Sequence, residues 1–316
     1  MEKLVMSAAE FLRLGTRGSR LALLQAEETA DALRALRRGW RPELHTISTE
    51  GDRRAEVPLA EMENRGIFIR EIEAALQQGE VDIAVHSLKD LPSRLPDGLT
   101  LAGVLPREDP RDVLVSTGGL AFDQLPAGSR VGTGSLRRAA QIRAQRPDLE
   151  VLPIRGNVET RLRKLDEGQV EALVMAAAGL RRAGYSARIA EHLPPERFLP
   201  SGGQGSIGLE VRSSDRRASE AAAAVSHAGS FDAAAAERVF LATLGGGCHT
   251  PVGCLARFPE EDVCELLGFV SDPAGHTPLY RRHSGGRAQA PELARRCAEE
   301  LLAAGGKTIL QELDNG

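Results

Sequence analysis

The regular alternation of strand-like and helix-like patterns over the first two thirds of the chain is the feature that most constrains its fold. Patterns typical of strands lie at 12–16, 43–48, 81–85, 113–115, 130–134, 151–155 and 172–177. Amphipathic patterns at 19–36 and 67–78 indicate helices, and Ser135 and Asn157 are expected to cap two more. Parallel strands need a long crossover connection, usually a helix. The sequence therefore predicts an α/β fold with a largely parallel sheet.

The last third of the chain has a different pattern, and a length of 316 residues also indicates more than one core. Residues 200–205 (PSGGQG) form a hinge-like breaker run. An Ala-rich helical stretch extends from Ser213 to about Thr243, followed by a glycine run, short strands and a final helix at 291–304. We expect three domains.

Charge and composition exclude several classes of function. The net charge is -4, whereas general nucleic-acid and membrane-surface binders are usually basic. Aromatic residues make up 3% of the chain, too few for base-stacking platforms. The N-terminal segment lacks the apolar core of a signal peptide, and no run approaches the ~18 apolar residues of a membrane span. We expect a cytoplasmic protein with no nucleic-acid or membrane partner.

All four cysteines lie in the last quarter of the chain, and none forms a C-x-x-C pair. The spacing of Cys248 and Cys254 lacks a second nearby pair, so no metal site is expected. Three glycines precede Cys248 and allow the backbone to expose a thiol in a tight loop. The residues alone leave two interpretations of Cys248 open, a functional thiol or a structural one.

Positive charge is concentrated in residues 130–164, which hold nine Lys and Arg against three Asp and Glu. Arg137, Arg138, Arg155 and Arg161 fall at expected strand ends and in the first turns of helices, where α/β sheets bind ligands. The guanidinium fork suits carboxylates, so several such positions indicate a ligand with several carboxylates or phosphates. Hydroxyls beside a helix N-terminus, Thr133 and Ser135, add to this anion site.

Two further groups stand at strand ends in the first half. Thr16-Arg17-Gly-Ser19 repeats the anion-binding device at the first strand–helix junction. Ser87, Lys89 and Asp90 place a hydroxyl, an ammonium and a carboxylate at the end of a buried strand. Asp90 could simply cap a turn, but beside so many cations an acid indicates a positive charge that develops during a reaction. One such pair at about 4 Å is worth up to ~4 kcal/mol, about a thousandfold in rate.

Two other motifs have simpler interpretations. Residues 203–208 match G-x-G-x-x-G, but no strand leads into them and a strand rather than a helix follows, so no dinucleotide site is expected. His86 follows an apolar strand pattern and is expected to be a core histidine with a hydrogen-bond partner.

Taken together, the motifs resemble those of the hydroxymethylbilane synthase (porphobilinogen deaminase) family, from Leu12 to about Ala304. They are TRGS at 16–19, AVHSLKDLP at 84–92, REDPRD at 107–112, SLRR at 135–138, RGNV at 155–158, GQG at 203–205 and GGC at 246–248. The resemblance implies the stepwise deaminative condensation of four porphobilinogen molecules into a linear tetrapyrrole, with release of ammonia. It also implies a monomer whose partner is porphobilinogen.

The resemblance implies a role for each matching residue. Cys248 holds a dipyrromethane cofactor through a thioether, and Asp90 is catalytic and stabilises a cationic intermediate. Asp90 also binds the cofactor, and the remaining cofactor-binding residues are Ser87, Lys89, Thr133, Ser135, Arg137, Arg138, Arg155 and Gly156. The substrate-binding residues are Arg17, Ser19, Phe68, Arg155, Asn157, Arg161, Arg182 and Gln204. Residues 49–66 match a mobile active-site loop, although Glu61 stands where relatives can carry lysine.

The implied fold has two α/β domains of periplasmic-binding-protein type flanking a cleft, and a smaller C-terminal α+β domain. Domain 1 is expected at 1–105 with 206–224, domain 2 at 106–205 and domain 3 at 225–316. Three rival hypotheses are weaker. A clamshell binding protein for a polycarboxylate would need neither Asp90 nor Cys248, a dinucleotide-dependent oxidoreductase lacks its glycine context, and a retired paralogue would not keep Asp90.

Overall fold

The computed structural model describes residues 10–36, 39–49, 69–245 and 250–315. Its first sheet has five strands in the order β2-β1-β3-β10-β4. They are β1 (Glu10–Arg17), β2 (Trp40–Ile47), β3 (Ile83–Ser87), β4 (Leu99–Val104) and β10 (Ile207–Arg212). Strand β1 is parallel to β2 and β3, whereas β10 is antiparallel to both of its neighbours.

Helices cover the first sheet because their apolar faces match the apolar strands. The three are α1 (Arg20–Leu36), α3 (Arg70–Gln77) and α7 (Arg216–Ala224). Ala26, Ala30 and Leu33 of α1 pack with Leu14 of β1 and Ile83 of β3 in one fully buried cluster. The Ser19 hydroxyl accepts a hydrogen bond from the Ala22 amide at 3.4 Å, so the predicted start of α1 is confirmed.

The second sheet repeats this plan in the order β7-β6-β8-β5-β9. Its elements are β5 (Asp112–Ser116), β6 (Arg130–Gly132), α4 (Leu136–Gln145), β7 (Glu150–Leu152), α5 (Val158–Asp166), β8 (Ala172–Ala176), α6 (Ala177–Arg182) and β9 (Glu191–His192). Both predicted caps are confirmed, since Ser135 and Asn157 accept from the amides of Arg138 and Thr160. Here β5 is antiparallel to its neighbours.

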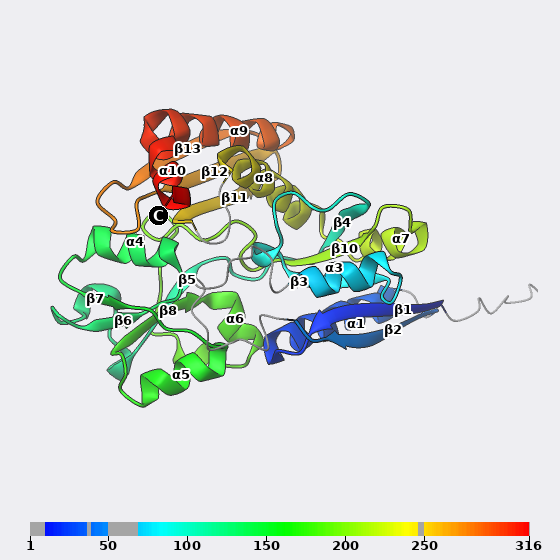
Figure 1. Cartoon of the computed structure of the whole chain (residues 1–316), viewed down its shortest axis with the longest axis horizontal. Coiled ribbons are helices and arrows are strands. Elements are labelled where there is room, and N and C mark those ends of the chain that lie inside the picture. The colour runs from blue at the N-terminus through cyan, green and yellow to red at the C-terminus, as the bar shows by residue number, and fades with distance from the viewer. Residues whose placement is uncertain (1–9, 37–38, 50–68, 246–249, 316) are drawn as a thin grey trace, which may run out of the picture.

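Two crossover segments join the sheets, residues 105–111 and 193–206, and Figure 1 shows the sheets lying beside each other beneath a third unit. In each sheet the antiparallel strand, β5 or β10, is the one that directly follows a crossover. The predicted largely parallel sheets are therefore correct except at these two strands. The residue ranges expected for the domains stay a prediction; the first sheet draws on residues 10–104 and 207–212.

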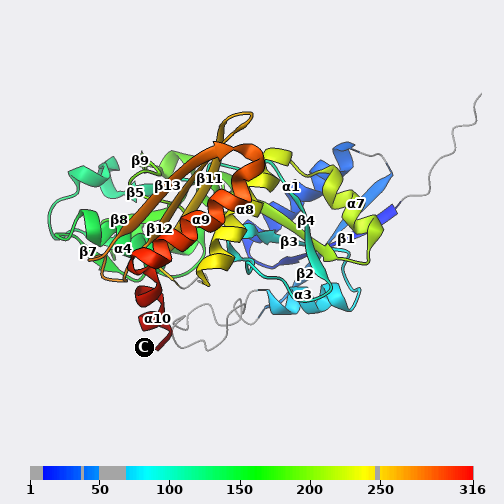
Figure 2. The same ribbon diagram turned by 90° about the horizontal axis from the view of Figure 1, so that it is seen from above.

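The third unit is an antiparallel sheet in the order β11-β12-β13 with helices on one face (Figure 2). It contains α8 (Ala228–Leu244), β11 (Val252–Glu260), β12 (Val263–Val270), β13 (Leu279–Gly286), α9 (Ala290–Leu301) and α10 (Lys307–Asn315). The strands have eight or nine residues, longer than the short strands expected. The helix α10 was not predicted, because Gly305 and Gly306 suggested that the helical segment ends there.

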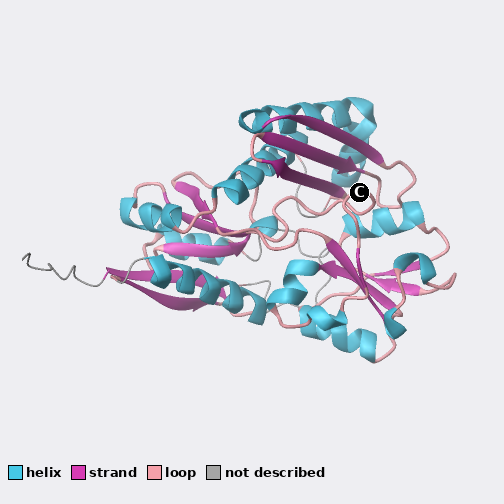
Figure 3. Ribbon diagram, turned by 180° about the vertical axis from the view of Figure 1, so that it is seen from behind, coloured by secondary structure: helices cyan, strands magenta, loops and turns pink. Residues whose placement is uncertain are grey.

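Three of the cysteines belong to the core of this third unit. Cys254, Cys264 and Cys297 are fully buried among the side chains of α8, α9 and the sheet. Burial raises the pKa of each thiol, for Cys297 to about 12, so these groups stay neutral and unreactive near neutral pH. The overall arrangement is two α/β units and a smaller α+β unit, as the fold prediction requires (Figure 3). Within the part of the chain that the structure describes, every helix is too short or too polar to cross a bilayer.

Candidate active site between the two sheets

The predicted site residues gather where the two sheets face each other. A small pocket is lined by Gln25 of α1, Ser87 and Lys89 at the end of β3, Arg182 of α6 and Gln204 of the second crossover, among others. Both sheets therefore contribute their strand ends and first helical turns, as expected for ligand sites of α/β folds. The Ser87 hydroxyl donates to the Gln25 side-chain carbonyl at 2.9 Å, which ties β3 to α1.

Asp90 and Lys89 lie in a short 3-10 turn, Leu88–Asp90, directly after β3. Leu88 is buried and anchors the turn, whereas Asp90 is exposed at its end. Burial lowers the pKa of Lys89 to about 8; Asp90 opposes this effect, and Arg138 adds to it. Asp90 therefore offers a solvent-facing carboxylate beside a lysine that sits in a field of positive charge.

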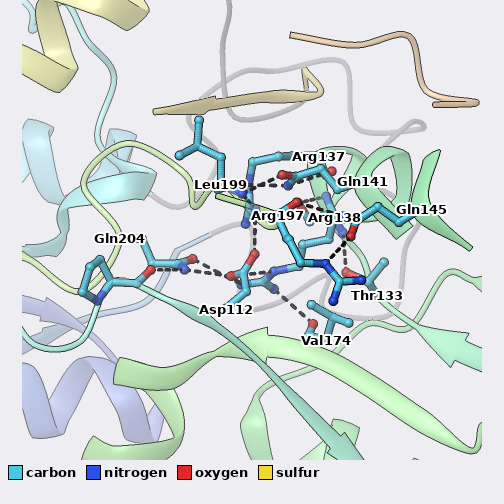
Figure 4. Close-up of polar contacts among 12 residues, drawn as sticks. Asp112, Thr133, Arg137, Arg138, Gln141, Gln145, Val174, Arg197, Leu199 and Gln204 are labelled. Atoms are coloured by element: carbon cyan, nitrogen blue, oxygen red, sulfur yellow. Dashed lines mark hydrogen bonds and ion pairs between the residues drawn. The ribbon is translucent and has the colours of Figure 1, made fainter. Parts of the chain in front are cut away.

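Asp112, at the start of β5, is a carboxylate with several partners near this pocket (Figure 4). It is fully buried; Arg137 Nη1 lies 2.7 Å from one of its oxygens, and Arg138 donates to the other at 3.0 and 2.8 Å. The Gln204 amide nitrogen also donates to Asp112 at 2.8 Å. Burial alone would raise the pKa of Asp112, but Arg137 and Arg138 hold it well below its usual range. Two guanidinium groups against one carboxylate leave a net positive charge here.

Two further arginines of the second sheet add to that positive charge. Arg161 donates from Nε to the Gly156 carbonyl at 2.8 Å. Burial, together with repulsion from Arg138 and Arg155, lowers the pKa of Arg161 to about 10, and Asp90 acts in the opposite direction. Burial also lowers the pKa values of Arg137 and Arg155. Burial is the main cause of all three shifts, and a carboxylate placed beside these guanidinium groups would favour their charged forms.

The small polar residues predicted for the site mostly shape its backbone. Thr133 is buried, and its hydroxyl accepts from the Ser135 amide at 3.2 Å. The Asn157 side chain caps α5 by accepting from Thr160 N at 2.8 Å. Gly156 has a φ of 115°, in the region that favours glycine, and a Cβ there would collide with Thr160. Arg17 and Ser19 lie half-buried at the end of β1, as the sequence placed them.

Arg182 and Gln204 both join parts of the molecule that are distant in sequence. Arg182 Nε lies 2.9 Å from a carboxylate oxygen of Glu28 in α1, and its Nη1 donates to the Gly205 carbonyl at 3.1 Å. The Gln204 side chain accepts from Arg138 at 3.2 Å and donates to the Pro110 carbonyl at 2.8 Å. The predicted binding residue Gln204 is thus buried, and its side chain connects the second crossover with Pro110 of the first and with Arg138.

Cys248 and Phe68 lie outside the described residues, as does the predicted loop 49–66 except for Thr49. Among the described residues that follow Cys248 in the sequence, Gly253 packs against Arg137, since a Cβ there would lie 3.3 Å from Arg137 Cδ.

Sequence reasoning missed two acids that organise the site. Asp112 stands in the REDPRD motif, yet the motif alone does not reveal its arginine partners. Glu237 of α8 is buried and binds Arg107 at 2.7 Å, the Gly203 amide at 2.5 Å and the Ala256 amide at 2.8 Å. An acid three and four residues after two alanines of the apolar face, Ala234 and Ala233, is the signal that could have revealed the buried Glu237.

Two expectations about simpler motifs are confirmed. His86 is buried in β3 with Nε2 3.0 Å from a carboxylate oxygen of Glu210 in β10. The glycines of 203–208 belong to a crossover that leads into β10 rather than to a strand–helix turn, and Gly203 and Gly205 both have positive φ. Across the described ranges, no three His, Cys, Asp or Glu side chains gather as metal ligands.

The fold and this site define a class of protein: two α/β units with a group of arginines where their sheets face each other, and an α+β unit attached. The chain belongs to the porphobilinogen deaminase family. Residues 12–220 match the family model described as "Porphobilinogen deaminase, dipyromethane cofactor binding domain", and residues 231–303 match the model of its C-terminal domain.

Curated relatives named porphobilinogen deaminase match over nearly the whole chain. The protein of Syntrophus aciditrophicus is 44% identical, with 96% of this chain and 99% of the relative covered. That of Syntrophobacter fumaroxidans is 45% identical, with 96% and 97% covered. Among solved structures, the VFT2 domain of Bordetella pertussis BvgS aligns with a TM-score of 0.42 at 16% identity, covering 68% of this chain and 86% of that one.

Proposed function

We propose that this chain is a hydroxymethylbilane synthase, a transferase that acts as a cytosolic monomer. It condenses four porphobilinogen molecules into the linear tetrapyrrole hydroxymethylbilane and releases ammonia. The tetrapyrrole is built on a dipyrromethane primer that is attached to Cys248 through a thioether. Family membership over residues 12–303 supports this activity, and the matched cofactor-binding domain supports the primer.

The observation that carries the proposal is the pair of buried guanidinium groups, Arg137 and Arg138, that share the single carboxylate of Asp112. Burial and mutual repulsion lower the pKa values of Lys89 and Arg161 to about 8 and about 10. Each pyrrole unit carries an acetate and a propionate, so a primer and a lengthening chain bring many carboxylates. Those carboxylates relieve the repulsion, which makes the surface fit a polyanion better than a single small anion.

The chain's own residues fit the dipyrromethane group. Lys89, Arg138 and Arg155 supply cations for its carboxylates, Ser135 supplies a hydroxyl at a helix N-terminus, and Cys248 supplies the thioether sulfur. When bound, the group provides an electron-rich pyrrole carbon at which the first new carbon–carbon bond forms. Arg137 has a supporting part, since it helps Arg138 and Gln204 hold Asp112.

Asp90 is the proposed catalytic residue. As ammonia leaves with the electron pair of the carbon–nitrogen bond, the substrate pyrrole becomes a delocalised cation. The exposed Asp90 carboxylate can approach the pyrrole N–H and stabilise that cation until the new bond forms and a ring proton is lost. Stabilisation of ~4 kcal/mol, felt only in the transition state, accelerates the step about a thousandfold.

The intact mass of the purified protein tests the covalent primer. We expect an adduct of two porphobilinogens less two ammonias that survives denaturation and is absent from Cys248→Ser. An active protein with unmodified Cys248 would remove the primer from the proposal. An inactive protein that binds polycarboxylates tightly would instead support the clamshell binding protein.

A further inference from the structure

The guanidinium group of Arg182 already has a carboxylate partner in this structure. Its Nε and Nη2 lie 2.9 and 3.5 Å from the two oxygens of Glu28, and Nη1 donates to the Gly205 carbonyl at 3.1 Å. Arg182 comes from α6 beside the second sheet, whereas Glu28 comes from α1 beside the first. The pair therefore crosses the seam between the two α/β units.

The Arg182 end of this pair faces the candidate active site. Arg182 lines the same pocket as Ser87, Lys89 and Gln204, and its side chain is 8% exposed. The Glu28 side chain, by contrast, is 42% exposed. The partly exposed Glu28 carboxylate is thus paired with the Arg182 guanidinium, which lines the pocket.

A second ion pair crosses the same seam with the charges exchanged. Arg20 at the start of α1 lies 2.9 Å from Glu159 of α5 and stacks over the ring of Tyr185 at 5.8 Å. Between the two pairs, Leu21 packs on Gly179 of α6, and Figures 1 and 3 both show α1 and α6 side by side. The seam does not depend on Glu28 alone, so Arg182 can change partner while the seam stays closed.

We propose that Glu28 is an internal competitor for the substrate: it holds Arg182 in the ligand-free protein and yields it to a carboxylate of porphobilinogen. This inference rests on the proposed function. Exchange of one carboxylate for another keeps the nearly buried guanidinium paired throughout, which avoids the cost of a buried unpaired charge. Because Glu28 is partly exposed, its release into water costs little. Glu28 is thus an affinity-setting residue and not a catalytic one.

The alternative role of Glu28 predicts the opposite result. If Glu28 instead orients Arg182 so that the guanidinium can bind substrate, removal of its charge weakens substrate binding. If the pair only fastens the seam, loosening the seam at Arg20 has the same effect as changing Glu28. These three roles are separated by steady-state kinetics of the cofactor-loaded enzyme.

The test compares Glu28→Gln with two controls. Glu27→Gln makes the same charge change one residue away in α1, where the side chain faces Arg34 at 4.0 Å. Arg20→Gln removes the second seam pair and leaves Arg182 untouched. For Glu28→Gln we expect KM for porphobilinogen to fall about three- to fivefold, with kcat unchanged within about twofold. Both controls are expected to keep the wild-type KM, and Glu28→Asp, which retains the charge, should restore most of it.

Each other outcome contradicts the proposal in a recognisable way. An unchanged or raised KM in Glu28→Gln, with active wild-type enzyme, removes the competitor role and leaves the proposed function intact. An equal fall of KM in Arg20→Gln assigns the effect to seam loosening. A wild-type protein that forms no tetrapyrrole refutes the proposed function itself.

Discussion

The two α/β units share one strand plan but carry opposite surpluses of buried charge. In the first sheet, Glu210 of the antiparallel strand β10 lies 3.0 Å from His86, and Glu73 of α3 adds a second acid nearby. In the second sheet, Asp112 of the antiparallel strand β5 meets two arginines. Each antiparallel strand therefore carries a buried carboxylate, but at a different point along the strand, Asp112 at the start of β5 and Glu210 further along β10, and with different surroundings.

This difference divides the proposed chemistry between the units. The first unit presents the exposed Asp90, suited to a developing cation, and its own arginines bind acids elsewhere, as Arg13 does with Asp82 at 2.8 Å. The second unit holds its arginines in excess and so suits carboxylates. Asp90 nevertheless lies close enough to Lys89 and Arg161 to favour the charged form of each.

The largest expected effect is on the stability of the second unit. Asp112→Asn leaves Arg137 and Arg138 buried without their carboxylate, which should lower the free energy of unfolding by about 3–5 kcal/mol. Asp123→Asn is the control, because its pair with Arg197 is exposed and worth at most about 1 kcal/mol. Urea denaturation measures both. Equal losses of unfolding free energy in the two variants would show that the buried Asp112 cluster stabilises the protein no more than an exposed ion pair does.

The next effect is on catalysis by the first unit. Asp90→Ala should reduce tetrapyrrole formation about a thousandfold while the melting temperature stays within a few degrees, because the side chain is exposed. Asp97→Ala, another exposed acid near the same sheet, should retain wild-type activity. Substantial tetrapyrrole formation by Asp90→Ala would show that Asp90 is not the catalytic residue and that the two sheets do not have separate roles.

A smaller effect concerns Lys89, which belongs to the first unit but experiences the charge of the second. Burial sets its pKa at about 8, so the side chain is charged below that pH and neutral above it. In the cofactor-free protein we expect the affinity for the dipyrromethane primer to fall about tenfold as pH increases from 7 to 9, because a charge-assisted hydrogen bond is lost. Lys89→Arg should abolish this fall. A pH profile that is identical in Lys89→Arg would assign the titration to another group.

The smallest effect tests the acid surplus of the first unit. Burial, then Glu210, raises the pKa of Glu73, so the folded protein binds that proton more tightly than the unfolded chain does. The sign follows from this: the stabilising contribution is complete below the unfolded pKa and is lost as pH rises through the folded one. Glu73→Gln should therefore raise the melting temperature at pH 8, with a smaller gain near pH 4. An equal rise in melting temperature at both pH values would contradict the excess of buried acidic groups in the first unit.

The sequence predicted elements whose information is local. The cap residues Ser135 and Asn157, the strand that delivers Asp90 and the position of the arginines all follow from short patterns. Strand direction does not, because β5 and β10 run antiparallel only through the crossovers that precede them. The partners of Asp112 and Glu28 were also missed, since they come from residues 25 to 154 positions away.

The contacts of Glu237 limit how the two α/β units can move relative to each other. The two crossover segments that join the α/β units both bind the Glu237 carboxylate, the first through Arg107 and the second through the Gly203 amide. Any rotation of one α/β unit against the other must therefore either keep both contacts, with Glu237 of α8 close to the axis, or break one of them.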